Sequence, residues 1–276
     1  MKSQALSDKA KRLAKHHHVT SNLIINHYFF DSVLKRIAKT KYQNHFILKG
    51  GYLLSIDLGI ITRTTNDLDF LLNINASENT VRKVAHEILK TDIGDSITYE
   101  LKAIEKIKEG SGLRIKILSR LERIRQPITI DIAFDDPITP GIVKYSYTDI
   151  LNEEEVTINI YPYETVLAEK LQTVVAKGIA SSRTKDLYDL YIISKLYTDK
   201  ISPSASKKAL RRTFVHRDTI DNVDFILKRL DVIKNNRTQR KLWERYERNQ
   251  YFAKDIQFTE LIESIKLLIE KIYDEI

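Results

Sequence analysis

The fold is decided by one stretch, residues 46–71, which reads FILKGGYLLSIDLGIITRTTNDLDFL. An apolar run ends at Gly50-Gly51, a second apolar segment follows, and a polar loop leads into a run of alternating charged and apolar residues. This pattern predicts a strand, a tight glycine turn, a helix, a loop and a second strand. Glycine at such a turn lets the backbone approach a ligand closely, and a helix N-terminus offers N–H groups to a phosphate. The stretch therefore indicates a phosphate-binding turn.

Two carboxylates, Asp67 and Asp69, lie two positions apart on the second predicted strand. Because residues i and i+2 of a strand point to the same face, both carboxylates would project together while Leu68 and Phe70 turn into a core. Adjacent like charges are unfavourable unless something neutralises them. Mg²⁺ takes carboxylate oxygens and keeps positions open for substrate phosphates, so a magnesium site is expected here. The plain alternative is a glycine turn beside a surface strand that carries aspartate at its edge.

Two further charged residues accompany this pair. Arg63 precedes it, and is either a surface cation that pairs with an aspartate or a clamp that binds phosphate or carboxylate through its two-pronged guanidinium. Asp131 lies in PITIDIAF, a predicted strand over residues 127–134, with apolar residues on both sides. An unpaired buried carboxylate is costly, so a metal ion or a cation is expected near Asp131.

The composition of the 276 residues limits the class of protein. A hydrophobic content of 42% supports one large or two modest domains, and no apolar run is long enough to cross a membrane. The first twenty residues hold no continuous apolar segment, so no signal peptide is expected. The absence of cysteine excludes disulfides and thiolate sites and fits a cytoplasmic protein. The formal charge of +8 and the pI near 9.3 favour a polyanionic partner.

The rest of the chain separates into a mixed half and a helical half. Helical spacing is expected over residues 1–37 and 77–89, and strands over 97–107, 113–121 and 156–161, with a hairpin turn at Gly110-Ser111-Gly112. After Gly178 the chain has no further glycine and a single proline, and helices are predicted over 164–177, 184–196, 203–215, 219–233, 238–251 and 259–276. The fold class is therefore α+β, with a mixed sheet and flanking helices in residues 1–163 and an all-helical domain in residues 164–276.

A second charged group lies where the helical half begins. Lys170 is on the opposite flank of its helix from Leu167 and Leu171, and Arg183 and Asp186 open the next helix. Lysine is a point charge suited to phosphates, and arginine is a fork for them. Aspartate at a helix start can cap the helix, orient the lysine or act as a general base, although an ordinary charged helix terminus is the alternative.

Five segments, FILKGGYLL, RTTNDLDF, ITIDIAF, YPYETVLAEKLQTVV and RTKDLYDLY, occur in this order between residues 46 and 191. In this combination the chain resembles the AbiE-type (AbiEii) nucleotidyltransferase toxins of type IV toxin–antitoxin systems, within the DNA polymerase β-like nucleotidyltransferase superfamily. The resemblance implies that Gly50 and Gly51 lie against a nucleoside triphosphate and that Asp67 and Asp69 are catalytic and bind Mg²⁺. Asp131 matches the superfamily's third metal-binding carboxylate. Gly51 stands where the wider superfamily often has serine, so backbone contacts to phosphate are expected rather than a hydroxyl contact.

The same resemblance assigns roles to the second group and to the chain as a whole. Lys170 and Asp186 would be catalytic, and Lys170, Arg183 and Arg63 would bind the nucleotide. The implied activity is transfer of a nucleotide from a nucleoside triphosphate, with Mg²⁺, to an acceptor hydroxyl, which blocks growth in abortive infection. A cognate antitoxin encoded in the same operon is the implied partner, and no membrane partner is expected.

The acceptor is expected to be tRNA. Residues 206–254 hold 14 Lys/Arg and 6 Asp/Glu, a formal charge of +8. The cations assigned to RNA are Arg211, Arg212, Arg217, Lys228, Arg229, Arg237, Arg240, Lys241, Arg245 and Arg248, and the interleaved rings are Phe214, His216, Trp243, Tyr246 and Tyr251. Cations suit phosphates and rings suit unstacked end bases, and some toxins resembling this family modify the acceptor end of tRNA.

Other functions remain open. The basic helices would be an ordinary solvated face, with Trp243 in the core, if the substrate were a small molecule or a protein hydroxyl. A non-catalytic RNA- or DNA-binding module is a further alternative. The adjacent Asp67 and Asp69 argue against it, because a dead site has no physical reason to keep like charges together.

Overall fold

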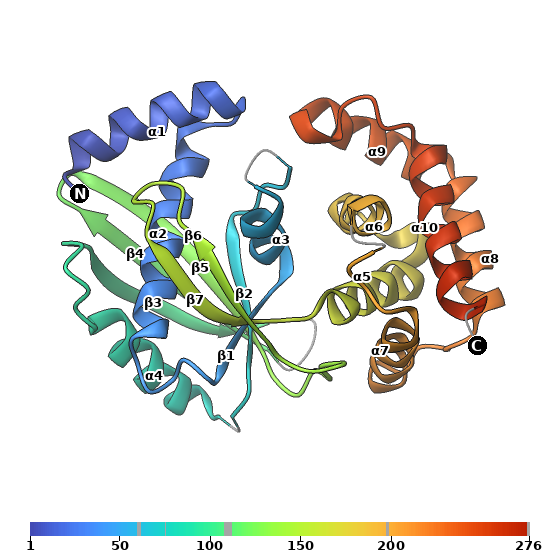
Figure 1. The fold of residues 1–276 in the computed structure, drawn as a ribbon, viewed down its shortest axis with the longest axis horizontal. Helices are drawn as coiled ribbons and strands as arrows, with labels where there is room; N and C mark the ends of the chain where they lie inside the picture. Colours follow the sequence, from blue (N-terminus) through green and yellow to red (C-terminus); the bar gives the residue numbers. More distant parts are fainter. Residues whose placement is uncertain (60–61, 75, 108–111, 197–198, 275–276) are drawn as a thin grey trace. The chain divides into compact units, whose positions relative to one another are not determined.

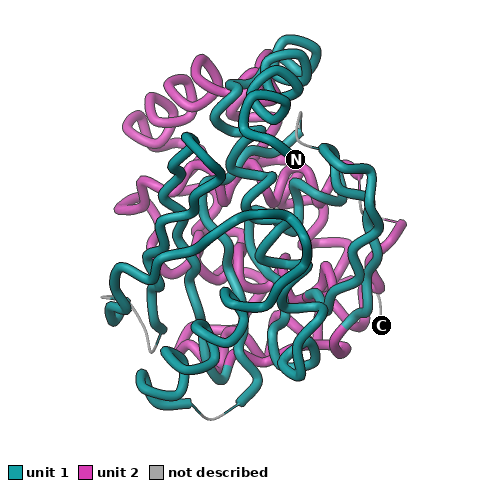
Figure 2. The backbone as a smooth tube through the Cα atoms, turned by 90° about the vertical axis from the view of Figure 1, so that its left-hand side faces the viewer, with its two compact units in different colours: residues 1–135, 143–160 teal, residues 136–142, 161–276 magenta. Residues whose placement is uncertain are grey.

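The computed structural model describes residues 1–59, 62–74, 76–107, 112–196 and 199–274. The chain divides into two compact units, which Figure 2 colours teal and magenta. The N-terminal unit comprises residues 1–135 and 143–160, and the C-terminal unit comprises residues 136–142 and 161–276. None of the described helices is long and apolar enough to span a membrane.

The N-terminal unit is a mixed sheet with helices (Figure 1). Its helices are α1 (Ser3–His17), α2 (Ser21–Ala38), α3 (Gly50–Leu58) and α4 (Glu78–Lys90). Its strands are β1 (Phe46–Lys49), β2 (Asp67–Leu72), β3 (Thr98–Lys106), β4 (Leu113–Leu121), β5 (Ile124–Ala133), β6 (Val143–Thr148) and β7 (Glu155–Ile160). They form one seven-stranded sheet in the order β3-β4-β5-β2-β1-β7-β6. The predicted mixed sheet is confirmed, and so is the strand–helix–strand order of residues 46–71.

Two local features differ from the expectation, and a third lies mostly outside the described residues. β6 was not predicted, because five of its six side chains are partly or fully exposed and an edge strand of this kind has no apolar alternation to reveal it. The sequence also allows Ser21 as the cap of the second helix, but Ser21 is the first residue of α2, and the cap is Thr20, whose side chain accepts a hydrogen bond from the Leu23 N–H. The turn expected at Gly110-Ser111-Gly112 lies, except for Gly112, outside the described residues.

Strand β2 lies in the middle of the sheet, parallel to β5 and antiparallel to β1. Leu68 and Phe70 are buried at 0% and 2% exposure, as the alternation predicted. Asp67 and Asp69, which alternate with them, are only partly buried. This placement turns the apolar side of β2 into the core and leaves its acidic side open to a ligand.

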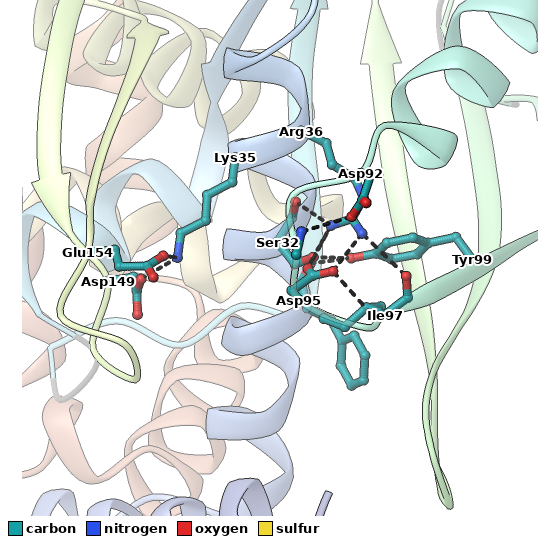
Figure 3. Close-up of polar contacts among 11 residues, drawn as sticks. Ser32, Lys35, Arg36, Asp92, Asp95, Ile97, Tyr99, Asp149 and Glu154 are labelled. Atoms are coloured by element: carbon teal, nitrogen blue, oxygen red, sulfur yellow. Dashed lines mark hydrogen bonds and ion pairs between the residues drawn. The ribbon is translucent and has the colours of Figure 1, made fainter. Parts of the chain in front are cut away.

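Helix α2 is held to the β3 side of the unit by a polar network (Figure 3). The guanidinium of Arg36 donates to both carboxylate oxygens of Asp95, each at 2.7 Å, and lies 4.9 Å from the ring centroid of Tyr99. The Tyr99 hydroxyl donates to Ser32 Oγ at 2.7 Å. Burial alone would raise the pKa of Asp95, but the hydrogen bonds from Arg36 and Ser32 outweigh it and the net shift is downward. Asp95 is therefore an anion that fixes α2.

A second acidic group on α2 is buried among tyrosines. Asp31 accepts hydrogen bonds from the hydroxyls of Tyr52 at 2.8 Å and Tyr147 at 2.6 Å. Burial raises the pKa of Asp31 to about 7, although the two hydrogen bonds act in the opposite direction. The adjacent Lys35 instead reaches Asp149, at 2.6 Å. Asp31 thus changes its charge near neutral pH inside the core.

The C-terminal unit is helical, as predicted, and its described residues form no strand. Its α-helices are α5 (Tyr163–Lys177), α6 (Thr184–Leu196), α7 (Pro203–His216), α8 (Val223–Lys234), α9 (Arg237–Asn249) and α10 (Phe258–Asp274), with short 3-10 turns η1 (Gly178–Ala180) and η2 (Tyr251–Ala253). Helix α8 begins four residues later than expected, because Asn222 caps it by accepting from the Phe225 N–H at 2.9 Å.

Candidate active site

Gly50 ends β1 and begins α3, and its backbone has φ +73°. This region strains any residue with a side chain. A β-carbon at Gly50 would also lie 2.2 Å from Asp69 Oδ2 and 2.7 Å from its carboxyl carbon. Glycine is therefore required at residue 50 for two reasons: the backbone conformation, and the Asp69 carboxylate that occupies the space a side chain would need.

Gly51 makes a second close approach in the same turn. A β-carbon there would lie 2.9 Å from Arg63 Nη2 and 3.1 Å from Thr65 Oγ1. Arg63 is only 4% exposed, so it is not the surface cation of the plain interpretation. Its Nη1 donates to the carbonyl of Thr64. The structure thus places a buried guanidinium directly beside the first turn of α3.

The strand register aligns four charged residues across the sheet. Lys49 on β1 pairs with Asp69 on β2, Asp69 pairs with Asp131 on β5, and Asp131 pairs with Arg114 on β4. Directly paired residues share a face of the sheet, and Asp67 lies two positions before Asp69 on that face. The predicted carboxylates Asp67, Asp69 and Asp131 are therefore brought onto one face within the N-terminal unit.

Arg114 is the cation expected near Asp131. Its Nε and Nη2 donate to the two oxygens of Asp131 at 2.8 and 2.7 Å, which is a bidentate pair. This hydrogen-bonded pair raises the pKa of the Arg114 guanidinium, against the effect of burial, and the charges of Asp131, Asp67 and Asp69 raise it further. Arg114 therefore lies in the field of all three carboxylates. The alternation of LRIKILSRL indicates which face of the strand Arg114 occupies but not its partner, so Arg114 is not among the residues predicted from the sequence.

The donor set fits a magnesium ion held by two carboxylates. No group of three or more acidic, histidine or cysteine side chains within the described part of the chain is arranged to hold a metal. Mg²⁺ is commonly bound by one or two carboxylates together with waters and substrate phosphates, and Asp67 and Asp69 supply that number from one strand face. The expected third ligand, Asp131, stays a prediction, and it requires that Arg114 release this carboxylate.

The C-terminal unit holds the second predicted group. Lys170 Nζ on α5 lies 2.8 Å from Asp186 Oδ1 and 2.7 Å from Asp189 Oδ2, both on α6. Arg183 Nε lies 2.8 Å from Asp186 Oδ2. The two aspartate side chains are 1% and 0% exposed, whereas those of Lys170 and Arg183 are 12% and 45% exposed. The structure thus joins Lys170, Arg183 and Asp186, as expected.

Asp189 is a member of this group that was not assigned to the site. Its position three residues after Asp186 places it on the same face of α6, and this spacing is visible in the sequence. Only the packing of α5 on α6 shows that both carboxylates meet Lys170. Two buried carboxylates around one ammonium hold that cation in a fixed place.

Several of the basic residues assigned to RNA have internal partners instead. Arg217 Nη2 lies 3.0 Å from both Asp136 and Glu169. Arg229 donates its Nε to the carbonyl of Val175 at 3.0 Å, next to the C-terminus of α5. These cations build the helical unit. The structure therefore gives Arg217 and Arg229 a structural role, and their assignment to RNA stays a prediction.

The aromatic part of the RNA interpretation is corrected in part. Trp243 is 1% exposed and donates its indole N–H to the carbonyl of Ile256 at 2.8 Å, and Phe214 is fully buried. Tyr246 packs on Trp243 with ring centroids 5.6 Å apart. Tyr251 is 59% exposed. Trp243 and Phe214 are therefore core residues of the helical unit, as the alternative interpretation held for Trp243, whereas His216 and Tyr251 are exposed.

Two solved structures are similar to this chain, whereas no curated protein gives a significant match. The crystal structure of a candidate nucleotidyltransferase from H. pylori shares 16% sequence identity and a TM-score of 0.51, over 93% of this chain and 97% of that chain. The structure of JHP933 from Helicobacter pylori shares 17% identity and a TM-score of 0.48, over 91% and 92%. The first likeness shows the fold alone.

The family comparison covers most of the chain. The model of the nucleotidyl transferase AbiEii toxin family, type IV toxin–antitoxin system, matches residues 32–264. This range includes both charged groups described above. The resemblance inferred from the sequence is confirmed: the chain belongs to the AbiEii nucleotidyl transferase toxin family and is a nucleotidyltransferase.

Proposed function

We propose that this protein transfers a nucleotide from a nucleoside triphosphate, with Mg²⁺, to a hydroxyl of tRNA, and that this modification arrests growth. The observation that carries the proposal is the contact of the Gly50 turn with Asp69, on a sheet face that also holds Asp67. A phosphate-accepting turn that touches a carboxylate pair is suited to a metal–triphosphate complex. Family membership supports the reaction class.

In this proposal the N-terminal group holds the triphosphate. Asp67 and Asp69 would bind Mg²⁺, which neutralises phosphate charge and polarises the phosphoryl oxygens. The N–H groups at the start of α3 would donate to phosphate oxygens, since Gly50 and Gly51 leave room for close approach. Arg63, buried beside this turn, would add positive charge to the same end of α3.

The C-terminal group supplies a fixed cation. We assign to Lys170 a contact with a nucleotide phosphate, with Arg183 as a second, more exposed donor. Asp186 accepts a hydrogen bond from Lys170, forms an ion pair with Arg183 and is 1% exposed, which favours an orienting role for its carboxylate over that of a general base. Asp189 would share that orienting role.

The reaction is an in-line displacement. The acceptor oxygen forms a bond to the α-phosphorus, the bond from the α-phosphorus to the bridging β-phosphate oxygen breaks, and pyrophosphate leaves with the added charge. The hydroxyl proton passes to solvent. Positioning and electrostatic stabilisation supply most of the rate in such reactions. The residues described above provide those two contributions and require no covalent protein intermediate.

The acceptor assignment is supported by the exposed cations of the helical unit. On α9, Arg237, Arg240, Lys241, Arg245 and Arg248 are exposed and form no ion pair with a described residue. Unpaired surface cations on one helix favour a polyanion. Transfer to a small molecule or to a protein hydroxyl would leave these cations without a function. The family also implies an antitoxin partner, and direct contact with this chain is part of the proposal.

The test is nucleotide transfer to RNA. Purified protein is incubated with Mg²⁺, each α-³²P-labelled nucleoside triphosphate in turn, and total cellular RNA, and the products are read on a denaturing gel. We expect label in a tRNA-sized band, its loss in Asp69→Ala, and its retention in Asp8→Ala, a control at an exposed aspartate of α1. Label on protein, or no label in RNA, would reject the tRNA assignment. Full activity in Asp69→Ala would reject the carboxylate site.

A further inference from the structure

A hollow in the C-terminal unit is lined by cations. Its volume is about 420 Å³, and its lining includes Thr139, Pro140, Ser204, Lys208, Arg211 and Arg212. No carboxylate of a described residue belongs to the lining. The helix that supplies most of it, α7, carries Lys207, Lys208, Arg211 and Arg212 and no acidic residue. The hollow is therefore strongly positive and open to an anion.

One wall of the hollow is rigid. Arg212 Nη1 donates to the carbonyl of Ile138 at 3.1 Å and to Thr139 Oγ1 at 2.9 Å. Thr139 is 6% exposed, and its N–H donates to Thr165 Oγ1 at 2.9 Å. The Nε and Nη2 groups of Arg212 have no partner among the described residues. A guanidinium fixed by one nitrogen keeps its other donors available to an anion without a large entropy cost.

The other two cations are uncompensated. Lys208 and Arg211 are exposed, and neither forms an ion pair with any carboxylate in the described ranges. Arg217, one residue beyond the same helix, is instead paired with Asp136 and Glu169. The unit thus neutralises its internal cation and leaves the cations of the hollow for an external charge. The N-terminus of α7, at Ser202 and Pro203, adds its positive dipole end.

We infer that this hollow binds the phosphate backbone of the acceptor RNA. The inference rests on the proposed function for the identity of the polyanion. The Arg212 fork suits one phosphate group, and Lys208 and Arg211 lie about one helical turn apart, roughly 5 Å along the axis, so they reach neighbouring phosphates. Because these contacts touch no base, they position any RNA of suitable shape and carry no sequence preference.

The test compares two charge-reversed variants of the full chain. Lys208→Glu/Arg211→Glu changes the hollow and spares Arg212, which holds the wall. Lys83→Glu/Lys90→Glu changes the net charge equally at exposed lysines of α4. Both are made in the Asp69→Ala background, so that binding is read without transfer. The probe is fluorescein-labelled bulk tRNA, followed by anisotropy between 50 and 200 mM KCl.

We expect the hollow variant to bind tRNA at least 10-fold more weakly and to lower the slope of log Kd against log salt by about 1–2, because each lost phosphate contact removes roughly 0.7–0.9 from that slope. The α4 variant should change Kd by less than about 3-fold. Equal losses in the two variants, or no loss in the hollow variant, would overturn the inference. Melting curves of both variants must match that of the parent, and the single substitution Lys208→Gln, which removes one charge and keeps a polar side chain, should give an intermediate loss.

Two further measurements are needed. One distinguishes RNA from free phosphate as the ligand, and the other distinguishes failure of this inference from failure of the proposed function. Inorganic phosphate could raise the melting temperature of the protein only when Lys208 and Arg211 are present, while the two substitutions leave tRNA binding unchanged. That result would overturn RNA as the ligand in favour of a free anion. Hollow-dependent tRNA binding without nucleotide transfer by the wild-type protein would sustain this inference and reject the proposed function. With the two hollow substitutions placed in the wild-type background instead, transfer with an unchanged KM for tRNA would sustain the proposed function and overturn this inference.

Discussion

Asp69 occupies the space that a side chain at residue 50 would need, since a β-carbon on Gly50 would lie 2.2 Å from Asp69 Oδ2. The contact joins the backbone turn at the start of α3 to a carboxylate of β2. A carboxylate that packs on a helix N-terminus has little freedom to move. The geometry of the proposed metal site is therefore set by the absence of one methyl group.

Gly50→Ala should strongly reduce transfer while leaving the protein folded. The alanine must adopt φ +73°, which costs roughly 1–2 kcal/mol, and must also displace the Asp69 carboxylate. We expect transfer to fall on the order of 100-fold, measured under single-turnover conditions. Gly94→Ala is the matched control, because Gly94 has φ +77° and no described atom lies within 4 Å of the position that an alanine methyl would take. Similar losses of transfer in both variants would show that strain alone is responsible.

Asp131→Asn should weaken transfer less than Asp69→Asn does. Both Asp131 oxygens accept from Arg114, so the loss should equal that of Arg114→Gln, about 10-fold, and the double variant should be no worse than either single one. Transfer is measured across a Mg²⁺ titration, in which Asp69→Asn removes activity at every concentration. A different result would make Asp131 a metal ligand: complete loss of transfer in Asp131→Asn, while Arg114→Gln needs no more Mg²⁺ than the wild type.

Asp189→Asn should raise the KM for the nucleoside triphosphate and lower stability. Lys170 would lose one of its two described carboxylate partners, and weakening a buried ion pair costs about 3 kcal/mol in denaturant unfolding. Lys195→Met, near the end of the same helix, removes an exposed 3.6 Å pair with Glu260 and should cost less than about 1 kcal/mol. An Asp189→Asn variant with wild-type KM and stability would contradict the orienting role.

Asp31→Asn should become more stable, relative to wild type, as the pH rises. The pKa of Asp31 is about 7 in the folded protein against 3.8 for the unfolded group, so the folded state binds the proton more tightly. The unfolding free energy of the wild type therefore loses up to about 4 kcal/mol between pH 4 and pH 8, and asparagine lacks this loss. Denaturant unfolding of both proteins at each pH measures the difference.

The comparison is needed because His27 acts in the opposite direction. Burial lowers the pKa of His27 to about 3, which makes the folded state more stable as the pH rises to 6.5. The effect of His27 is present in both proteins and cancels in the difference. A stability difference between Asp31→Asn and wild type that does not change with pH would show that Asp31 stays ionised in the core.

The sequence determined the local architecture. Apolar alternation on β2 and β5, the glycine turn at residues 50–51, and the loss of glycine after Gly178 each act over a few neighbouring residues, and they set the strands, the turn and the helical half within a few positions. The expectations that differed from the structure also concerned single local features. β6 is an edge strand whose side chains are mostly exposed, so it has no apolar pattern. Asn222 caps α8, but other polar residues nearby are equally plausible caps when only the sequence is known.

Only the tertiary structure decided which side chains meet. Periodicity shows which face of a strand a residue occupies, but strand order and register decide its neighbour, and these depend on contacts far apart in the chain. The register of β4 on β5 is what pairs Arg114 with Asp131, and the register of β2 on β1 is what brings Asp69 to Gly50. In the helical unit, the packing of the helices likewise makes Asp189 a partner of Lys170. The same packing buries Trp243, because burying a large apolar ring is more favourable than leaving it in water.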